Sequence, residues 1–229
     1  PDRQVHGYGL TPALVATLEP LQPDLLVTVD HGIACHAGIA AAKARGWQVI
    51  VTDHHLPGPS LPAADAIVDP NQPGDEFPSK ALAGVGVLFY LLLTLRASLG
   101  VKADLASLLD LVAVGTVADM VPLDANNRAL VGAGLRRLRG GQGCAGLNAL
   151  ARVAKRILAT LTSSDIGFAI GPRINAAGRL EDMRLGIECL LTDDATQAHG
   201  LAEALHAINA ERRGLQDEML AAADSAMAR

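Results

Sequence analysis

VIVTDHHLPG, residues 49–58, is the stretch from which the expected fold of this chain follows. Its β-branched residues 49–51 predict a buried strand, and the proline and glycine that close the stretch predict a turn. Between strand and turn stand Asp53, His54 and His55. All three side chains can bind a metal ion, so this strand end is the first candidate for a functional site.

The segments around this stretch predict a parallel sheet. An apolar run, LLVTV at residues 25–29, indicates a buried strand, and residues 47–52 form the second strand. A helix of small residues is expected between them, over residues 36–45. A strand, a crossover helix and a strand favour parallel pairing. A short third strand is expected around residues 66–68.

The rest of the chain has mostly helical patterns. Further helices are expected over residues 83–99, 105–118, 126–139, 147–158 and 164–170. A last helix should run from Asp194 to the C-terminus, with Gln197 completing a capping box. We therefore expect an α/β fold with a parallel sheet flanked by helices, a helical part from about residue 105, and a long C-terminal connecting helix. The expected domains are residues 1–190 and the connecting helix, residues 191–229, which leads toward a further domain.

Composition and charge exclude some classes of protein. Half of the 229 residues are apolar, 3% are aromatic, and the net charge is −5, so the whole chain does not attract polyanions. A basic stretch between residues 125 and 164 contains no acidic residue and seven basic ones: Arg128, Arg136, Arg137, Arg139, Arg152, Lys155 and Arg156. This stretch is either a local nucleic-acid contact or an ordinary solvated helical face.

Other features bear on compartment and extent. The three cysteines form no CxxC pair, which argues against a disulfide framework or zinc ribbon and fits a reducing cytoplasm. The longest apolar stretch, residues 81–95, is shorter than the roughly 20 residues of a membrane span, so we expect a buried core helix and no membrane contact. The chain begins at Pro1, without a methionine and just before a GYGL turn sequence, so we expect it to be part of a longer protein.

Acidic and imidazole side chains follow the two clearest strands. Asp30 comes directly after the first strand, and Asp53 with His54 comes directly after the second. Because parallel strands end at one edge of a sheet, these groups should lie close together. Asp119, in VGTVADMVPL, ends an apolar segment and is a third candidate. A single aspartate after a strand is often only a turn residue, but the combination favours a divalent metal such as Mn²⁺.

The order of motifs resembles a known family. The motifs, in order along nearly the whole chain, are TVDHG, VTDHHLPG, ADAIVDPNQPGDEFPSKALAGVGV, DLVAVGTVADMVPLDANNR and GPRINAAGRLEDM. They closely resemble the DHH phosphoesterase superfamily, and within it the RecJ-type single-strand-specific exonucleases. The resemblance implies a cytoplasmic monomer that degrades single-stranded DNA from the 5′ end to mononucleotides in repair and recombination. It also implies two Mn²⁺ or Mg²⁺ ions that activate a bridging water, and a single-strand-binding protein and a helicase as partners.

The resemblance also assigns roles to the metal-site residues. Asp30 matches an aspartate that bridges two metal ions, and Asp119 matches another ligand. In the DHH motif Asp53 supports the site, His54 ligates metal, and His55 faces the phosphate or the metal. We expect none of the other histidines to be ligands, namely His6, His31, His36, His199 and His206.

Three arginines and an asparagine resemble substrate contacts of the family. Arg3 matches a 5′-phosphate anchor, and Arg173 and Arg179 of GPRINAAGR look like contacts to the DNA backbone. Asn175, between them, would orient an arginine or the scissile group, and the glycines of the motif would let the backbone approach a ligand closely. Arg179 has a structural alternative, pairing with one of the two acids that follow it.

Two points separate this chain from the family pattern or leave alternatives. No DxDG motif occurs in it, although RecJ-type enzymes use that motif for further metal-binding carboxylates, so we expect these 229 residues to fold yet to be inactive as a nuclease. Asp110 competes with Asp119 for the ligand role, although GTVAD is the better match. Other functions that fit are a DHH-type phosphatase or nanoRNase acting on short oligonucleotides or pAp, and a non-catalytic nucleic-acid-binding scaffold.

Overall fold

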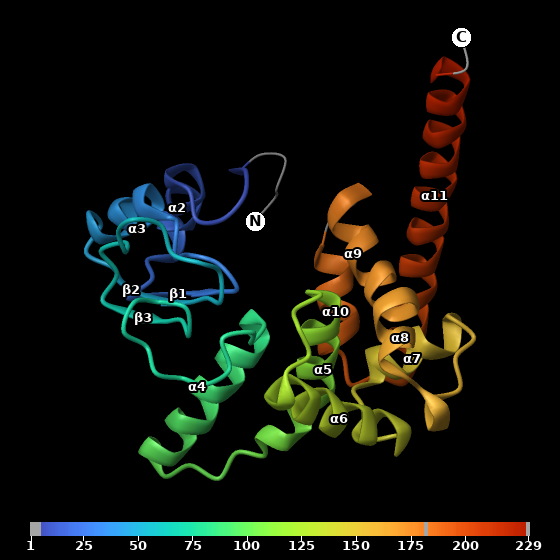
Figure 1. Ribbon diagram of the computed structural model, residues 1–229, viewed down its shortest axis with the longest axis horizontal. Coiled ribbons are helices and arrows are strands. Elements are labelled where there is room, and N and C mark those ends of the chain that lie inside the picture. The colour runs from blue at the N-terminus through green and yellow to red at the C-terminus, as the bar shows by residue number, and fades with distance from the viewer. Residues whose placement is uncertain (1–5, 181–182, 228–229) are drawn as a thin grey trace. The chain divides into compact units, whose positions relative to one another are not determined.

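The computed structural model describes residues 6–180 and 183–227 (Figure 1). The chain separates into two compact units, residues 1–133 and residues 134–229. The expected domain boundary at residue 190 stays a prediction, and it does not coincide with the division between these units. The expected fold class, a parallel sheet flanked by helices and followed by a helical region, is confirmed.

The first unit is built on a three-stranded parallel sheet in the order β1-β2-β3. The strands are β1 (Leu25–Val29), β2 (Gln48–Thr52) and β3 (Ala66–Val68), close to the predicted positions. Their last residues, Val29, Thr52 and Val68, pair across the sheet. The residues that follow the three strands therefore lie side by side at one edge of the sheet.

Helices cover both faces of this sheet (Figure 1). On one side lie α2 (Pro12–Leu18), which the short 3-10 turn η1 (Glu19–Leu21) follows, and α3 (His36–Lys43). Their apolar residues join Val49 and Val51 of β2 in a core that includes Leu14, Ile39 and Trp47. Sequence reasoning missed α2, although Thr11 caps it with its hydroxyl and a proline opens it.

The other face of the sheet packs on α4 (Gly84–Leu99). A second core joins this helix to the elements that follow it, namely η2 (Leu105–Leu108), α5 (Leu109–Ala118) and the start of α6 (Ala125–Arg139). Val87 and Phe89 of α4 meet Val112 of α5 in that core. The sheet is thus held between two apolar layers.

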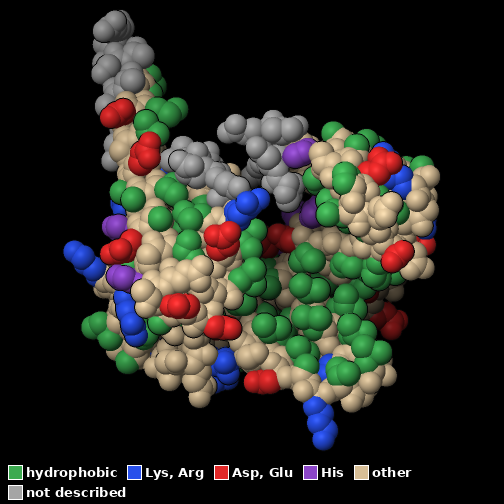
Figure 2. Space-filling model, turned by 180° about the vertical axis from the view of Figure 1, so that it is seen from behind, with side chains coloured by type: hydrophobic (Ala, Val, Ile, Leu, Met, Phe, Trp, Pro, Cys, Tyr) green, Lys and Arg blue, Asp and Glu red, His purple; other side chains and the backbone are tan. Residues whose placement is uncertain are grey.

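Two predictions of burial are only partly right. Leu25, Val27 and Val29 of β1 are 38–45% exposed, because β1 pairs with β2 alone among the described residues and is an edge strand there. Helix α4 is buried in its first half, whereas Leu95 and Leu99 are exposed. Figure 2 shows many apolar side chains at the surface on the face that it presents. Within the described residues, no helix is both long and apolar enough to cross a membrane.

The second unit contains only helices among its described residues. After the end of α6 they are α7 (Ala145–Val153), η3 (Leu158–Thr160), α8 (Ser163–Asp165), the π-helix η4 (Ile166–Ile170), α9 (Gly171–Leu180), α10 (Arg184–Leu191) and α11 (Ala195–Met227). Helix α11 packs against α7, α9 and α10 through its first half, where Ala198, Ala202 and Leu205 are fully buried.

Two expectations for the second unit need correction, and a third stays a prediction. The third is that the glycines of GPRINAAGR let the backbone approach a ligand closely; they lie in helix α9. Helix α7 ends at Val153 and not at residue 158, because Lys155 adopts a left-handed backbone with φ +56°. Asp194 caps α11 by accepting the Thr196 and Gln197 N–H groups, but the Gln197 side chain bonds Thr192, so no capping box forms there.

Candidate metal centre

Asp30 follows β1 directly and occupies a strained backbone position. Its φ is +66°, a left-handed value that a residue with a Cβ atom adopts at a cost, and such strain concentrates at functional sites. Its N–H donates to the Thr52 carbonyl at 3.0 Å, which extends the strand pairing by one residue. The first residue of α4, Gly84, touches it from the other side, since a Cβ at Gly84 would lie 2.2 Å from Asp30 Oδ1.

The turn after Asp30 brings the chain back under the end of β2. Gly32, with φ +127°, makes this turn, and a Cβ there would lie 2.5 Å from the Thr28 hydroxyl oxygen. The turn places the Ile33 N–H 2.9 Å from Asp53 Oδ2, so that it donates a hydrogen bond to this carboxylate. The loop after β1 is therefore anchored to the residue that follows β2.

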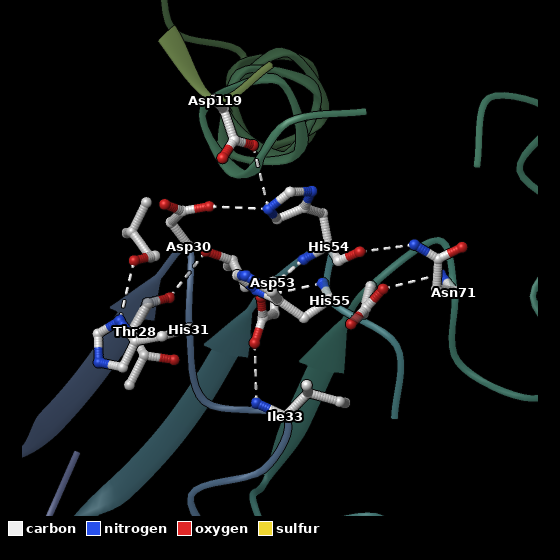
Figure 3. A network of polar contacts seen from close by, with 12 residues as sticks. Thr28, Asp30, His31, Ile33, Asp53, His54, His55, Asn71 and Asp119 are labelled. Atoms are coloured by element: carbon white, nitrogen blue, oxygen red, sulfur yellow. Dashed lines mark hydrogen bonds and ion pairs between the residues drawn. The ribbon is translucent and has the colours of Figure 1, made fainter. Parts of the chain in front are cut away.

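Asp53 is buried and its carboxylate is fully used inside the protein (Figure 3). Oδ2 accepts from Ile33, while Oδ1 accepts the N–H groups of His54 at 2.8 Å and His55 at 3.2 Å and contacts His55 Nδ1 at 2.7 Å. Burial by itself would raise the pKa of Asp53, but these hydrogen bonds outweigh it and lower the pKa. Asp53 is thus an ionised anchor for the loops and for the His55 ring.

His54 lies between two carboxylates. Its Nε2 is 3.2 Å from Asp30 Oδ1 and 3.2 Å from Asp119 Oδ2 (Figure 3). This nitrogen is buried, and neither carboxylate oxygen lies in the direction that a hydrogen bond with it requires. The interaction with Asp30, and after it the negative charge of Asp119, raises the pKa of His54 against the opposing effect of burial.

Asp119, and not Asp110, reaches this cluster. Asp119 is the C-cap residue that directly follows α5, and its side chain points at the His54 ring (Figure 3). Burial raises its pKa. Asp110 is buried in the first turn of α5, where its carboxylate accepts the Leu111 N–H at 2.8 Å.

The donor set fits a divalent metal ion. Asp30, His54 and His55 each offer one ligand atom, and these atoms lie within 4.8 Å of one another. Ligand atoms held about 2.1 Å from one octahedral ion lie about 3 Å apart, close to the 3.2 Å spacings around His54 Nε2. A buried ring nitrogen needs a partner, and His54 Nε2 has no hydrogen bond that could serve as one. A metal ion is a partner that fits such a nitrogen. Carboxylate oxygens suit Mn²⁺ and Mg²⁺, and the imidazole nitrogen favours a transition-metal ion such as Mn²⁺ over Mg²⁺.

None of the four residues expected to contact substrate belongs to the cluster described above. Arg3 falls outside the described residues, and Arg179 lies in α9 with a side chain that is likewise not described. Arg173 of α9 donates through Nη1 to the Ala169 carbonyl at 2.6 Å and through Nε to His206 Nδ1 at 3.1 Å. Burial lowers the Arg173 pKa. Asn175 is exposed on α9.

Several members of the basic stretch have structural contacts. Arg137 donates to the Gln142 carbonyl at 3.0 Å, and Arg139 donates to the Leu161 carbonyl at 2.8 Å, so both tie helix α6 to later loops. Arg156 pairs with Asp165 at 3.2 Å. Acidic and basic side chains are interspersed on the face that Figure 2 presents.

Sequence reasoning missed the residues that hold the ligand loops in place. Asn71 donates to the His54 carbonyl, and Asn127 is fully buried below the loop after Asp119. Gly84 supports Asp30 from below. Asparagines and glycines are too common in a sequence for their positions alone to reveal such a role, so only the observed contacts identify them.

Comparison with known proteins adds a family and relatives. The family described as "DHH family, N-terminal domain" matches residues 2–116. Single-stranded-DNA-specific exonuclease RecJ of Dickeya dadantii is 53% identical, over 96% of this chain and 40% of the relative. Its Escherichia coli counterpart is 51% identical, with the same coverage of 96% and 40%. This chain thus spans about 40% of the length of these curated relatives.

Solved structures agree with these relatives. A crystal structure of exonuclease RecJ bound to manganese matches 96% of this chain and 55% of that chain, at 40% identity and a TM-score of 0.85. RecJ from Thermus thermophilus in complex with Mn²⁺ matches 91% of this chain and 31% of that chain, at 39% identity and a TM-score of 0.80.

Proposed function

Because this chain belongs to the DHH family, we propose that it carries the metal centre of a single-strand-specific DNA exonuclease, a hydrolase of phosphodiester bonds. One observation carries the proposal. His54 Nε2 is buried 3.2 Å from two carboxylates with no hydrogen bond to either, an arrangement suited to a bound cation. The similarity to RecJ proteins, including structures solved with manganese, supports Mn²⁺ or Mg²⁺ as that cation.

In this proposal Asp30, His54 and Asp119 hold the metal. When bound, the metal supplies an activated water and neutralises charge that develops on the phosphate. Asp53 is ionised and accepts the hydrogen of His55 Nδ1, which fixes the ring tautomer and leaves Nε2 facing outward as an acceptor or ligand. His55 is half exposed, so it is placed to meet the metal or a phosphate oxygen.

The finer features of the activity rest on family resemblance. We propose digestion from the 5′ end to 5′-mononucleotides, two metal ions in the complete active site, and a role in DNA repair and recombination in the cytoplasm. A single-strand-binding protein and a helicase are the proposed partners of a monomeric enzyme. Arg3, Arg173, Asn175 and Arg179 remain the proposed substrate contacts.

These 229 residues contain no DxDG motif, so we propose that they hold one ion and not two. A nuclease that needs two ions would then be inactive in this chain alone, because one preorganised charge-stabilising element is worth about a hundredfold in rate or more. Calorimetric titration of the chain with Mn²⁺ should give one weak site and no digestion of single strands. Two tight sites with robust exonuclease activity would contradict this proposal.

Substrate and polarity are tested with the chain extended to the full length of its relatives. With Mn²⁺, 5′-labelled single strands should release labelled mononucleotide at once, while 3′-labelled strands should shorten gradually. Release of the 3′ label first would contradict digestion from the 5′ end. A preference for strands of two to five nucleotides would favour the nanoRNase alternative, and binding without hydrolysis would favour the scaffold.

A further inference from the structure

A three-residue segment before α4, Ser79–Ala81, contributes no ligand yet bonds to elements on two sides of the metal centre. The Lys80 carbonyl accepts a hydrogen bond from Asn71, and the Ala81 carbonyl accepts one from Asn127. The Ser79 hydroxyl donates to Asp124 Oδ2 at 2.6 Å, and this serine is 4% exposed. All three residues of the segment are therefore held by side chains from elsewhere in the first unit.

On one side, Asn71 ties the segment to the loop that carries His54. Its Nδ2 donates to the His54 carbonyl at 2.6 Å (Figure 3). The same Nδ2 donates to the Lys80 carbonyl at 3.2 Å, so one amide group joins the two loops. Asn71 is itself held, because its N–H donates to Oδ1 of the buried Asp69 at 2.7 Å. Asp69 directly follows β3, so this hydrogen bond fixes Asn71 relative to the sheet.

On the other side, Asn127 ties the segment to the loop that carries Asp119. Its Nδ2 donates to the Ala81 carbonyl at 2.7 Å and to the Pro122 carbonyl at 2.9 Å, three residues after Asp119. The Asn127 side chain is fully buried, and its N–H donates to Asp124 at the start of α6. This second amide therefore repeats the bridge that Asn71 makes.

The segment also leads into the contact below Asp30. Gly84 comes three residues after Ala81, and it packs so closely on Asp30 that no Cβ would fit. The stretch from Ser79 to Gly84 thus contacts Asp30 directly and is connected to the loops of His54 and Asp119 through the two asparagine side chains, although none of its residues belongs to the ligand set.

We infer that Asn71 and Asn127 are positioning residues, which set the distance between His54 and Asp119 through the Ser79–Ala81 segment and thereby set the affinity for the metal. Side chains behind the ligands control metal sites because a ligand must be held to within about 0.5 Å of its working position. Loss of such a side chain typically lowers metal affinity about 10- to 100-fold. This inference rests on the proposed metal centre and deepens it.

The test is a Mn²⁺ titration of the 229-residue chain by calorimetry, with Co²⁺ absorption spectra as a readout of coordination geometry. Asn71→Ala should weaken Mn²⁺ binding about 10- to 100-fold and alter the Co²⁺ spectrum. The matched control is Gln72→Ala, because Gln72 also donates a side-chain amide hydrogen, at 3.1 Å, but to Ile67 of β3 and not to a ligand loop. Gln72→Ala should keep the wild-type affinity within about twofold and leave the spectrum unchanged, as expected for a change that touches no ligand loop.

A second pair of variants keeps the test decisive if truncation harms folding. Asn71→Asp and Asn127→Asp preserve side-chain volume but remove the donor, so each should still weaken Mn²⁺ binding about tenfold or more. Because both amides act through one segment, the double variant should lose less than the product of the single losses. Equal Mn²⁺ affinities and Co²⁺ spectra for Asn71→Asp, Gln72→Ala and wild type would overturn the inference. Failure of the wild-type chain to bind any metal would instead overturn the proposed metal centre and the inference with it.

Discussion

The two compact units differ in how many polar side chains they bury. Among the described residues nine polar or charged side chains are buried, and eight of them lie in the first unit, with only Asn209 in the second. Burial of a polar group costs free energy unless hydrogen bonds satisfy it, so a region that buries many of them has to fix their partners in place. In the first unit these partners hold the proposed metal ligands in place, whereas among the described residues no charged residue of the second unit is buried. Substitutions at polar positions should therefore change stability and metal binding more in the first unit than in the second.

The largest effect is expected for His54→Ala in the first unit. It removes the ligand atom between Asp30 and Asp119, so Mn²⁺ binding should be lost and hydrolysis by the full-length enzyme should fall at least about a hundredfold. Circular dichroism should show a fold that is kept. The control is His31→Ala, a nearby half-buried histidine whose ring contacts the Val29 carbonyl. Wild-type turnover in His54→Ala would remove this residue from the site.

Gly84→Ala tests how tightly the first unit is built. The added methyl group would lie 2.2 Å from Asp30 Oδ1 and 2.7 Å from its Cα atom, so the loop or the helix must shift. Overpacking of this kind costs about 1–3 kcal/mol, and the shift should also weaken Mn²⁺ binding. Urea unfolding and calorimetry measure both effects. Gly58→Ala, where a Cβ would meet nothing within 4 Å, should change neither quantity; equal behaviour of the two variants would refute the close contact.

Arg136→Glu tests whether the second unit's exposed charges bind nucleic acid. Among the described residues the Arg136 side chain makes neither a hydrogen bond nor an ion pair, unlike that of Arg139, which donates to the Leu161 carbonyl. If Arg136 touches a phosphate, the salt dependence of single-strand binding should lose about 0.7 from its logarithmic slope. An unchanged slope in a salt series would make this part of α6 an ordinary solvated face. Arg139→Lys, which keeps the charge, should preserve the slope and lower only the stability.

The smallest effect is expected at the capping box of the second unit. The Thr162 hydroxyl and N–H donate to Asp165 and lower its pKa below the unfolded value of about 3.9. A depressed pKa stabilises the fold above that pH, and the gain disappears as the pH falls through the lower folded value. Thr162→Ala should therefore lose about 1 kcal/mol at about pH 6, and the difference from wild type should shrink below about pH 3.9. A pH-independent difference in thermal unfolding would contradict the role of Asp165.

Much of the first unit follows from short-range sequence patterns. The runs LLVTV and QVIVT are rich in β-branched residues and form strands where expected, and the parallel order follows from the helix between them. Because paired parallel strands end together, the placement of Asp30 beside Asp53 and His54 was also predictable. Helix α2 was missed although Thr11 and the proline after it are a clear start signal.

Helices of the second unit were less predictable. A helix was expected to end at residue 170, but the chain stays helical through α9, Gly171–Leu180, in spite of the proline of GPRINAAGR. Gly178 of this helix faces Met183, since a Cβ there would lie 3.1 Å from the Met183 sulfur. Packing of this kind depends on a neighbour that local propensity does not describe.

The strands, the acids and histidines at their ends, and the family of the chain can all be predicted from short sequence patterns. The packed structure was needed to show that Asp119 and not Asp110 faces His54, and that Asn71 and Asn127 bond to the loops of the proposed ligands. The physical reason is the range of the interactions. Strand propensity and strand-end position are read within a few residues, whereas the bond from Asn127 to the Ala81 carbonyl joins residues 46 positions apart and exists only once both cores have packed.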